Sequence, residues 1–356
     1  SLEPSMNFLQ RILLAVSLVA LPCQAQTGDG TVVSEVSCKP INLSYVQYLE
    51  ASQRIHLAEA GRASAFGIDP PPFADFQRTL FTEQEYLQRT APLNFECLRI
   101  RYLSDGMEVV GHIFKPIETS GKKFPVIIYN RGGNREFSKN TPFDMVEFYD
   151  FLKAGFVVIA SQYRGNDGGE GREEFGGADV KDVLNLVPLA RSLGYADTNN
   201  IFMYGHSRGA MMTLLAIKEG CPIRAAAVVG VSSDLEIESA RRPELARMES
   251  ELIPGFDEDP ESAYFERSAA NWAHRIDVPL LILHGADDWR VEVGQALTLA
   301  RELIDANNDD FELKIYANDD HSLTLNREDK TKRIVGWFQR HSIPPVQPQH
   351  AAVAGH

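Results

Sequence analysis

The stretch IFMYGHSRGAMM, residues 201–212, decides the fold class. An apolar run typical of a buried strand leads into the pattern Gly-x-Ser-x-Gly, and a helix-forming run follows it. A serine on such a sharp strand-to-helix turn exposes its hydroxyl at the carboxyl end of a strand, where parallel sheets carry their chemistry. The same short pattern also occurs as an ordinary glycine turn, so the surrounding sequence must decide the role of Ser207.

Apolar runs alternate with helical patterns around this stretch. The expected strands are residues 125–130, 156–163, 201–207, 225–233, 279–285 and 312–319, and the expected helices are residues 144–155, 179–194, 208–220, 294–307 and 329–342. Runs that are apolar on both faces and joined by helices are typical of a parallel sheet with right-handed crossovers. The sequence therefore predicts an α/β fold with a doubly wound, mostly parallel sheet.

Other segments flank or interrupt this alternation. Residues 98–116 contain two alternating stretches about a Ser-Asp-Gly turn, which predicts a hairpin that opens the core. Residues 26–97 predict a short helical N-terminal extension, and the polar insert at residues 235–277 predicts a helical cap over the carboxyl edge of the sheet. The main domain is expected at residues 98–342, followed by a loose tail at residues 343–356.

The first residues predict export. SLEPS, residues 1–5, looks like a remnant of cloning, and Met6 then opens a signal-peptide pattern with Arg11, a short apolar run and small residues before Gln26. The apolar run is too short for a transmembrane helix. We expect residues 1–25 to be removed and the mature chain to be periplasmic or secreted.

Cys38, Cys97 and Cys221 remain after that cleavage, and an exported protein can form disulfides. A bond between Cys38 and Cys97 would attach the N-terminal extension to the first strand of the core, whereas Cys221 is expected to be a small buried apolar residue. Three free thiols are the alternative. The spacing of cysteines and histidines indicates no metal site, so we expect neither a metal nor a cofactor.

The composition limits the classes of partner. The chain has 356 residues, of which 44% are hydrophobic and 24% charged, as is typical of a globular protein with a full-sized core. Its formal net charge is −14, and nucleic acids and anionic membranes bind through basic patches, so the charge argues against both as partners. A small peptide or ester remains as substrate, and a homo-oligomer is left open.

A serine hydroxyl is a weak nucleophile at neutral pH and needs a base with an orienting acid. Asp287 and Asp288 follow the expected strand at residues 279–285, and His321 follows the last expected strand. Each has an ordinary explanation on its own, because paired aspartates often form a solvated turn and a loop histidine often lies at the surface. Their joint position at two strand ends, in the chain order Ser, Asp, His, favours a catalytic triad with Ser207 as nucleophile and His321 as base.

Several longer motifs resemble the catalytic domain of the prolyl oligopeptidase family of serine peptidases, which has the α/β-hydrolase fold. They are, in order, YRGNDGGEGREEFGGADVKDV, GHSRGA, ERSAANWAHRIDVPLLILHGADDWRVE and NDDHSL, and the resemblance covers about residues 98–342. In that family the acid occupies the fourth position of Gly-x-x-Asp-x-x-Val, here GADDWRV, so the resemblance selects Asp288 over Asp287. It likewise implies Ser207 as nucleophile and His321 as base.

The sequence departs from the family pattern in three places. Ala210 stands where members commonly have the last glycine of Gly-x-Ser-x-Gly-Gly. Larger members carry a β-propeller that filters substrates by size, but too few residues precede residue 98 for one, so selectivity is expected from the cap, the helical extension or assembly. Arg131 stands where members often have an aromatic residue or a histidine before a Gly-Gly pair.

The oxyanion hole is expected from two segments of the chain. The backbone N–H of Arg208 is one donor, and the loop with Arg131, Gly132 and Gly133 supplies the second. The guanidinium of Arg131 is expected either to donate to the oxyanion or a substrate carboxylate, or to pair with a nearby acid such as Glu136. The sequence favours neither alternative.

A glycine-rich segment, residues 165–177, follows a strand end and is expected to lie beside the site. Arg164 is expected to brace it. Glu170, Glu173 or Glu174 is a candidate for binding a substrate amine, as acidic residues do in exopeptidases, but the sequence favours a solvated loop.

The sequence thus favours an exported serine hydrolase that acts through an acyl-enzyme. A peptidase of the prolyl oligopeptidase type acting on short peptides comes first, because of the resemblance. A carboxylesterase acting on small acyl esters is the alternative, since the fold does not fix the substrate. A non-catalytic binding protein on a hydrolase scaffold is a third hypothesis, against which the intact Ser, Asp and His set argues.

Overall fold

The computed structural model describes residues 28–39, 41–67 and 72–344. The expected signal peptide, residues 1–25, lies outside the described residues, as does nearly all of the expected tail. Among the helices of the described part of the chain, none is long and apolar enough to span a membrane.

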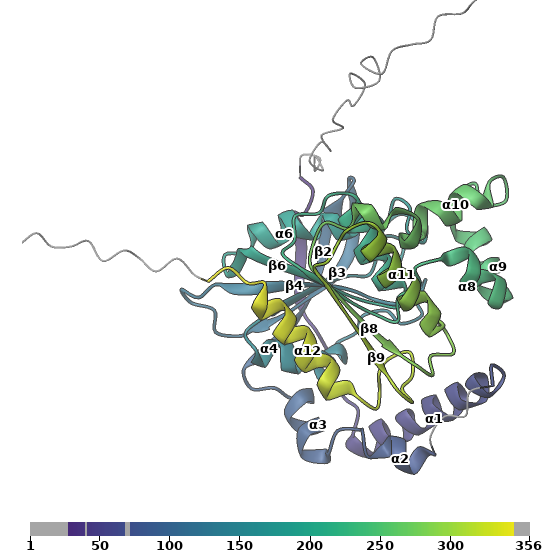
Figure 1. The fold of residues 1–356 in the computed structure, drawn as a ribbon. Coiled ribbons are helices and arrows are strands. Elements are labelled where there is room, and N and C mark those ends of the chain that lie inside the picture. The colour runs from purple at the N-terminus through teal and green to yellow at the C-terminus, as the bar shows by residue number, and fades with distance from the viewer. Residues whose placement is uncertain (1–27, 40, 68–71, 345–356) are drawn as a thin grey trace, which may run out of the picture.

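A mixed sheet forms the centre of the molecule and has nine strands within the described residues (Figure 1). In chain order they are β1 (Val32–Ser37), β2 (Phe95–Ser104), β3 (Met107–Pro116), β4 (Phe124–Asn130), β5 (Val157–Ser161), β6 (Ala196–His206), β7 (Ala226–Val229), β8 (Leu280–Gly285) and β9 (Phe311–Tyr316). The spatial order is β1-β2-β3-β5-β4-β6-β7-β8-β9. The pairs from β1 to β5 are antiparallel and those from β5 to β9 are parallel, so the predicted doubly wound, mostly parallel sheet is confirmed.

Helices cover both faces of the sheet, which explains why strands such as β5, β7 and β8 are buried along their whole length. One face carries α4 (Asp144–Lys153) and α12 (Arg327–Arg340). The other carries α5 (Val180–Leu184), α6 (Leu186–Ser192), α7 (Arg208–Lys218) and α11 (Val293–Asp305). The helix predicted at residues 179–194 divides at Asn185, because Pro188 fits in the first turn of a new helix but not in a helix interior.

The N-terminal extension contains a strand besides the predicted helices. β1 pairs with β2, so the sheet begins before the hairpin that was expected to open it. The helices α1 (Tyr45–Ser64), α2 (Phe73–Gln77) and α3 (Glu83–Thr90) follow. α1 and α3 each begin with a capping box, at Ser44 and Thr82. A small apolar cluster of Tyr48, Phe81 and Tyr86 packs the extension against α4.

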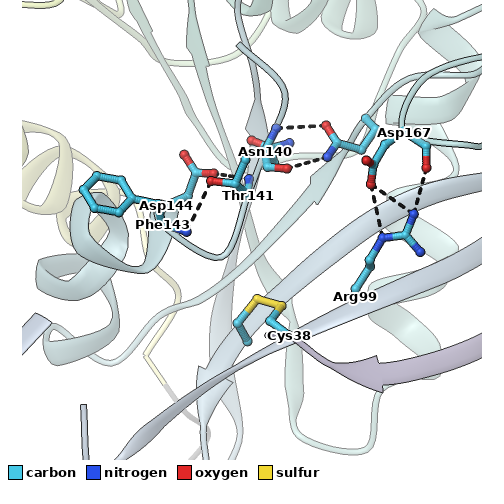
Figure 2. Close-up of a disulfide and its surroundings, with 9 residues drawn as sticks. Cys38, Arg99, Asn140, Thr141, Phe143, Asp144 and Asp167 are labelled. Carbon is cyan, nitrogen blue, oxygen red and sulfur yellow. Dashed lines mark hydrogen bonds and ion pairs between the residues drawn. A yellow bond between two sulfur atoms is a disulfide. The ribbon is translucent and has the colours of Figure 1, made fainter. Parts of the chain in front are cut away.

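A disulfide between Cys38 and Cys97 attaches the extension to β2, as expected (Figure 2). The backbone N–H of Cys38 also donates to the carbonyl of Cys97 at 2.9 Å. Nearby, Arg99 of β2 pairs with Asp167 of the glycine-rich segment at 3.0 Å. Cys221 is buried in the core, as predicted.

The insert between β7 and β8 is helical, as predicted for a cap. It contains α8 (Leu235–Arg241), α9 (Pro243–Leu252), α10 (Pro260–Arg267) and the 3-10 helix η3 (Ala269–Arg275). Figure 1 shows α8, α9 and α10 on one side of the molecule and α1 with α2 on another, near the ends of β8 and β9. These two groups of helices are the walls of the site described next.

Candidate active site

Ser207 lies on the turn between β6 and α7, with φ 58° and ψ −126°. Residues other than glycine rarely adopt a positive φ, and this strained conformation is typical of a nucleophile elbow. The N–H of Ser207 donates to the carbonyl of Val229 at 2.9 Å, and the carbonyl of Ser207 accepts from the N–H of Ala210 at 2.8 Å. These bonds hold the turn at the carboxyl end of the central strand.

Two glycines make this turn sterically feasible. A Cβ at Gly205 would lie 2.2 Å from the carbonyl oxygen of Gly209, and a Cβ at Gly209 would lie 1.8 Å from the carbonyl oxygen of Asn130. Both distances are far shorter than a van der Waals contact. The start of α7 therefore packs directly on the end of β4. Ala210, which replaces the last glycine of the family pattern, is fully buried there.

His321 and Asp288 form a pair on the loops that follow β9 and β8. Nδ1 of His321 lies 2.7 Å from Oδ2 of Asp288, and Oδ1 accepts from the N–H groups of Arg290 and Val291 at 2.9 Å. Burial by itself would raise the pKa of Asp288, but the imidazoles of His321 and His284 lower it below its ordinary value. An ionised Asp288 fixes the proton of His321 on Nδ1 and leaves Nε2 able to accept a proton.

Two other histidines hold this pair, and the sequence did not indicate their roles. Nε2 of His284 lies 3.2 Å from Oδ2 of Asp288 and 2.8 Å from the carbonyl of Val291. Nε2 of His206 lies 3.1 Å from the carbonyl of His321. Burial lowers the pKa of His206 to about 3, so this imidazole stays neutral and donates to that carbonyl. In the sequence, only the position of His206 and His284 at the ends of expected strands could have indicated these roles.

The loop that carries His321 is shaped by Asp319. The carboxylate of Asp319 is buried and accepts from the N–H groups of Leu325 and Asn326 and from the side chain of Asn326, at 2.9 to 3.1 Å. A Cβ on Gly230 would lie 2.7 Å from Cε1 of His321, so the glycine leaves the space that the imidazole occupies.

The loop of Arg131, Gly132 and Gly133, which is expected to supply an oxyanion-hole donor, lies against Ser207. Gly132 and Gly133 line the same pocket as Ser207, and a Cβ on Gly132 would lie 3.0 Å from Cβ of Ser207. Arg208 is the first residue of α7, where backbone N–H groups have no partner within the helix. Two backbone segments therefore approach the serine at the place where an oxyanion would form.

The guanidinium of Arg131 fits neither of the two expectations. It is buried and donates at 2.9 to 3.3 Å to the backbone carbonyls of Gln162, Gly132, Phe137 and Arg135. Glu136 instead pairs with Lys139 and accepts from the N–H of Asp167. Because its donors are used by carbonyls, Arg131 shapes the oxyanion loop and does not face the pocket.

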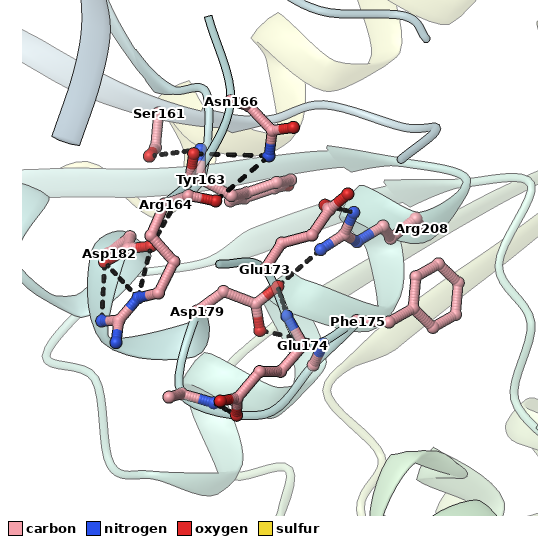
Figure 3. A network of polar contacts seen from close by, with 12 residues as sticks. Ser161, Tyr163, Arg164, Asn166, Glu173, Glu174, Phe175, Asp179, Asp182 and Arg208 are labelled. Atoms are coloured by element: carbon pink, nitrogen blue, oxygen red, sulfur yellow. Dashed lines mark hydrogen bonds and ion pairs between the residues drawn. The ribbon is translucent and has the colours of Figure 1, made fainter. Parts of the chain in front are cut away.

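Glu173 is buried and points toward Arg208 (Figure 3), so it is not part of a solvated loop. Its side chain is 4% exposed and accepts from the guanidinium of Arg208 and from the N–H of Arg135. Asp179 pairs with the same guanidinium at 2.5 Å. Burial would raise the pKa of Glu173, but Arg208 lowers it below its ordinary value. Glu173 therefore links the oxyanion loop to the start of α7.

The other charged residues singled out near residues 165–177 also have structural partners. Glu170 accepts from the N–H of Glu108, and Glu174 accepts from the N–H of Ala178. Arg164 braces the segment as expected, through Asp182 at 2.8 Å on α5 and Asp105 at 2.8 Å in the β2–β3 turn. Because Glu170, Glu173 and Glu174 all have partners within the chain, the geometry gives no support to the candidate amine-binding role.

Ser207 lies where two pockets meet. The larger has a volume of about 480 Å³ and contains Ser207 and His321. One wall of it is made by the N-terminal extension, with Ile55 and Glu59 of α1 and Phe76 of α2. The smaller has a volume of about 110 Å³ and lies between Ser207 and the cap, where Leu235, Leu245 and Met248 line it.

The wall formed by α1 is attached to the loop that carries Asp288. Glu59 of α1 accepts from Arg290 twice, at 2.7 and 3.1 Å. Phe66, just after α1, stacks on Trp289 with 5.5 Å between ring centroids. The extension is therefore part of the site and not only a lead-in to the core.

Comparison with known proteins places this geometry in a family. The model of the prolyl oligopeptidase family matches residues 142–343. The chain is 31% identical over 205 residues to Uncharacterized peptidase YtmA of Bacillus subtilis (strain 168), with 57% of this chain and 78% of that protein covered. It is 25% identical over 234 residues to dipeptidyl peptidase 8 of Homo sapiens, with 62% of this chain but only 25% of that protein covered.

Solved structures show the same fold. Pyrococcus horikoshii acylaminoacyl peptidase superposes with a TM-score of 0.62 at 23% identity, over 73% of this chain and 44% of that one. A Mycobacterium tuberculosis puromycin-hydrolyzing peptidase superposes with a TM-score of 0.57 at 23% identity, over 66% of this chain and 37% of that one. The chain thus spans less than half the length of these structures, and the shared part has the α/β-hydrolase fold.

Proposed function

Since the chain belongs to the prolyl oligopeptidase family and is a serine hydrolase of the serine-peptidase type, we propose that it cleaves short peptides through an acyl-enzyme on Ser207. One observation carries the proposal: His321, whose Nδ1 lies 2.7 Å from the buried Asp288, lines the same pocket as a serine on a strained strand-to-helix turn. This is the set of groups that serine acyl transfer requires.

In the proposed mechanism, Oγ of Ser207 attacks the scissile carbonyl while Nε2 of His321 takes its proton. Asp288 stabilises the imidazolium that forms. The N–H of Arg208 and the amides of the Gly132–Gly133 segment stabilise the oxyanion of the tetrahedral intermediate. His321 then gives the proton to the leaving amine, and water hydrolyses the acyl-enzyme by the same steps.

The pocket dimensions support a short substrate. A volume of about 480 Å³ lies within the range of sites that enclose a drug-sized ligand, which corresponds to a peptide of a few residues. Because α1 and α2 form a wall of this pocket, the extension would limit substrate size. The names of the relatives, an acylaminoacyl peptidase and a dipeptidyl peptidase among them, agree with short substrates.

We also propose that the mature chain is exported. The signal-peptide pattern at residues 1–25 supports this, and so does the disulfide between Cys38 and Cys97, because disulfides persist in oxidising compartments. Fractionation of expressing cells with N-terminal sequencing of the product tests it. Uncleaved protein in the cytoplasm would contradict export.

Covalent labelling tests the nucleophile. A fluorophosphonate probe should label the wild-type chain on Ser207, as found by peptide mass mapping, and should not label Ser207→Ala. A folded wild-type chain that stays unlabelled would overturn the proposal in favour of a binding protein. Matched p-nitroanilides and p-nitrophenyl esters of the same acyl group then separate a peptidase from an esterase.

A further inference from the structure

The two pockets at Ser207 differ in one catalytic group. Ser207 lines both pockets, whereas His321 lines the larger one and not the smaller one. In the proposed mechanism the imidazole of His321 gives its proton to the leaving group, so the leaving atom must lie on the same side of Ser207 as this imidazole. A leaving group on that side enters the larger pocket, and the acyl group faces the smaller one.

The larger pocket has a mostly apolar surface, part of which belongs to the N-terminal extension. Its large apolar side chains are Ile55, Phe76, Phe137, Trp289 and Leu325. Ile55 of α1 is 63% exposed and Phe137 of the loop after β4 is 58% exposed, although both line a pocket beside Ser207. Covering such side chains with an apolar group removes them from water, which favours binding of that group.

Most charged side chains that line the larger pocket have partners within the chain. Glu59 of α1 pairs with Arg290 at 2.7 Å, and Asp320 accepts from the hydroxyl of Thr324 at 2.8 Å. Asp287 also lines the pocket, and its negative charge disfavours an acidic leaving residue. The wall formed by α1 therefore presents an apolar surface to the leaving group, with its charge already paired.

Contacts within the extension and with the core hold this wall in place. Phe76 of α2 stacks on the imidazole of His56 of α1, with 4.4 Å between ring centroids. The stacking of Phe66 on Trp289 and the ion pair of Glu59 attach α1 to the loop after β8. A wall that is fixed before the substrate arrives loses little entropy on binding, so it can distinguish one side chain from another.

We propose that the N-terminal extension forms the subsite for the leaving residue, and that Ile55 makes this subsite selective for a residue with an apolar side chain. The inference rests on the proposed function, because only a chain that forms an acyl-enzyme on Ser207 has a leaving residue. It assigns the two pockets to the two sides of the scissile bond, which a limit on peptide length does not do.

Transfer of an acetyl group to added amines tests this subsite separately from acylation. Oγ of Ser207 displaces p-nitrophenol from p-nitrophenyl acetate. An amine in the place of the leaving residue then attacks the acetyl carbonyl, and its proton passes through His321 to Oγ, which gives an N-acetyl amide and free Ser207. Leucinamide and asparaginamide compete in one reaction at equal concentrations of neutral amine, because their side chains have similar shapes and differ in polarity. The products formed with Ser207→Ala are subtracted as the uncatalysed background.

The full wild-type chain should form about tenfold more N-acetyl-leucinamide than N-acetyl-asparaginamide, as partial burial of an isobutyl group would give. Ile55→Asn should lower this ratio by at least about threefold. The control is Leu57→Asn, which should keep the ratio, because Leu57 is 59% exposed on the same helix but does not line the pocket. Both products come from the same acetyl-enzyme, so a change in overall activity cancels in the ratio.

Three results would overturn the inference in a chain that hydrolyses p-nitrophenyl acetate through Ser207. The first is a ratio near one in the wild-type chain, including transfer to neither amine. The second is a ratio that Ile55→Asn leaves unchanged, and the third is a ratio that Leu57→Asn lowers equally. A wild-type chain that releases p-nitrophenol no faster than Ser207→Ala would instead overturn the proposed function.

Discussion

Asp288 is the buried charge on which the orientation of His321 depends. It accepts from two backbone N–H groups and lies within 3.2 Å of two imidazoles, so its position is fixed by four contacts. Asp287, beside it in the sequence, lines the larger pocket instead. The two aspartates are therefore a matched pair for testing which one serves His321.

We expect Asp288→Asn to lower kcat by about 10³- to 10⁴-fold with little change in KM, because the amide would favour the wrong tautomer of His321. Steady-state kinetics on a p-nitroanilide substrate measures both constants. Asp287→Asn should change kcat by less than about tenfold, since it lies outside the hydrogen bonds of the pair. A larger loss in Asp287→Asn than in Asp288→Asn would contradict the assignment.

Glu238 of α8 gives a second prediction at this scale, in the pH dependence of stability. It is buried and lies 3.7 Å from Nη1 of Arg241 and 3.9 Å from Nη1 of Arg242. Its folded pKa of about 7 lies above the ordinary value of 4.5, so the folded chain binds more protons than the unfolded chain between these pH values. The free energy of unfolding therefore falls as the pH rises from 4.5 to 7. Glu238→Gln removes this loss, and should be more stable than the wild-type chain at pH 8 by up to about 3 kcal/mol.

Urea unfolding at pH 5 and pH 8 measures this effect. The stability gain of Glu238→Gln should be largest at pH 8 and small at pH 5. The control is Glu236→Gln, at an exposed glutamate on the same helix, which should show no such difference. A gain that does not depend on pH would mean that Glu238 titrates normally.

The sequence predicted the residues whose chemistry has a motif, and missed those that act through packing. Ser207, Asp288 and His321 each follow a strand end, so fold and chain order together brought them into one site. Nothing in the local sequence shows that the guanidinium of Arg131 would donate to backbone carbonyls, or that Glu173 would be buried. Those outcomes depend on contacts between segments that only the folded chain brings together.

At the scale of elements, the helices and strands of the core were predictable because their periodicity is strong. The N-terminal extension was harder to predict. The side chains of β1 are almost all exposed on both faces, so the sequence has no alternation of apolar and polar residues that would indicate a strand. Its pairing with β2 is what orders it. The composition of the cap predicted that it is helical, but it did not predict that Glu238 of α8 is buried beside Arg241 and Arg242.

The disulfide gives a prediction at this scale. It closes a loop across 59 positions that includes α1, α2 and α3. Replacing both Cys38 and Cys97 with alanine should lower the free energy of unfolding by about 4 kcal/mol in the chain-entropy model. Because α1 is a wall of the larger pocket, KM should rise more than kcat falls.

Denaturant unfolding and steady-state kinetics on the same preparations check both parts. The wild-type chain treated with a reductant should reproduce the double variant in both measurements, which serves as the control. Equal stability of the oxidised and reduced chains would show that the disulfide adds nothing to the fold. An unchanged KM would show that α1 keeps its place without it.

At the scale of the whole molecule, Ser207 lines two pockets, and the walls of these pockets come from different parts of the chain. The larger is closed by the segment before the core and the smaller by the insert within it. This arrangement predicts a limit on peptide length. We expect kcat/KM to fall steeply once a peptide exceeds a few residues, and no cleavage of a protein such as casein.

A series of peptides with one fixed cleavage site and increasing length measures that limit by product analysis. Glu59→Gln weakens the attachment of α1 to Arg290 and should move the limit toward longer peptides, whereas Glu50→Gln, exposed on the same helix, should leave it in place. Rapid cleavage of casein by the wild-type chain would contradict a pocket walled by α1.

The attachment of α1 through Glu59 also sets an order of assembly. Its partner Arg290 lies 231 positions later in the chain. The ribosome therefore synthesises α1 long before it synthesises the loop to which α1 binds. We therefore expect the core to form its sheet first and α1 to dock afterwards. By the same argument we expect this contact to open early in partial unfolding. A mildly stressed molecule would therefore lose its discrimination between substrates before it loses the ability to cleave them.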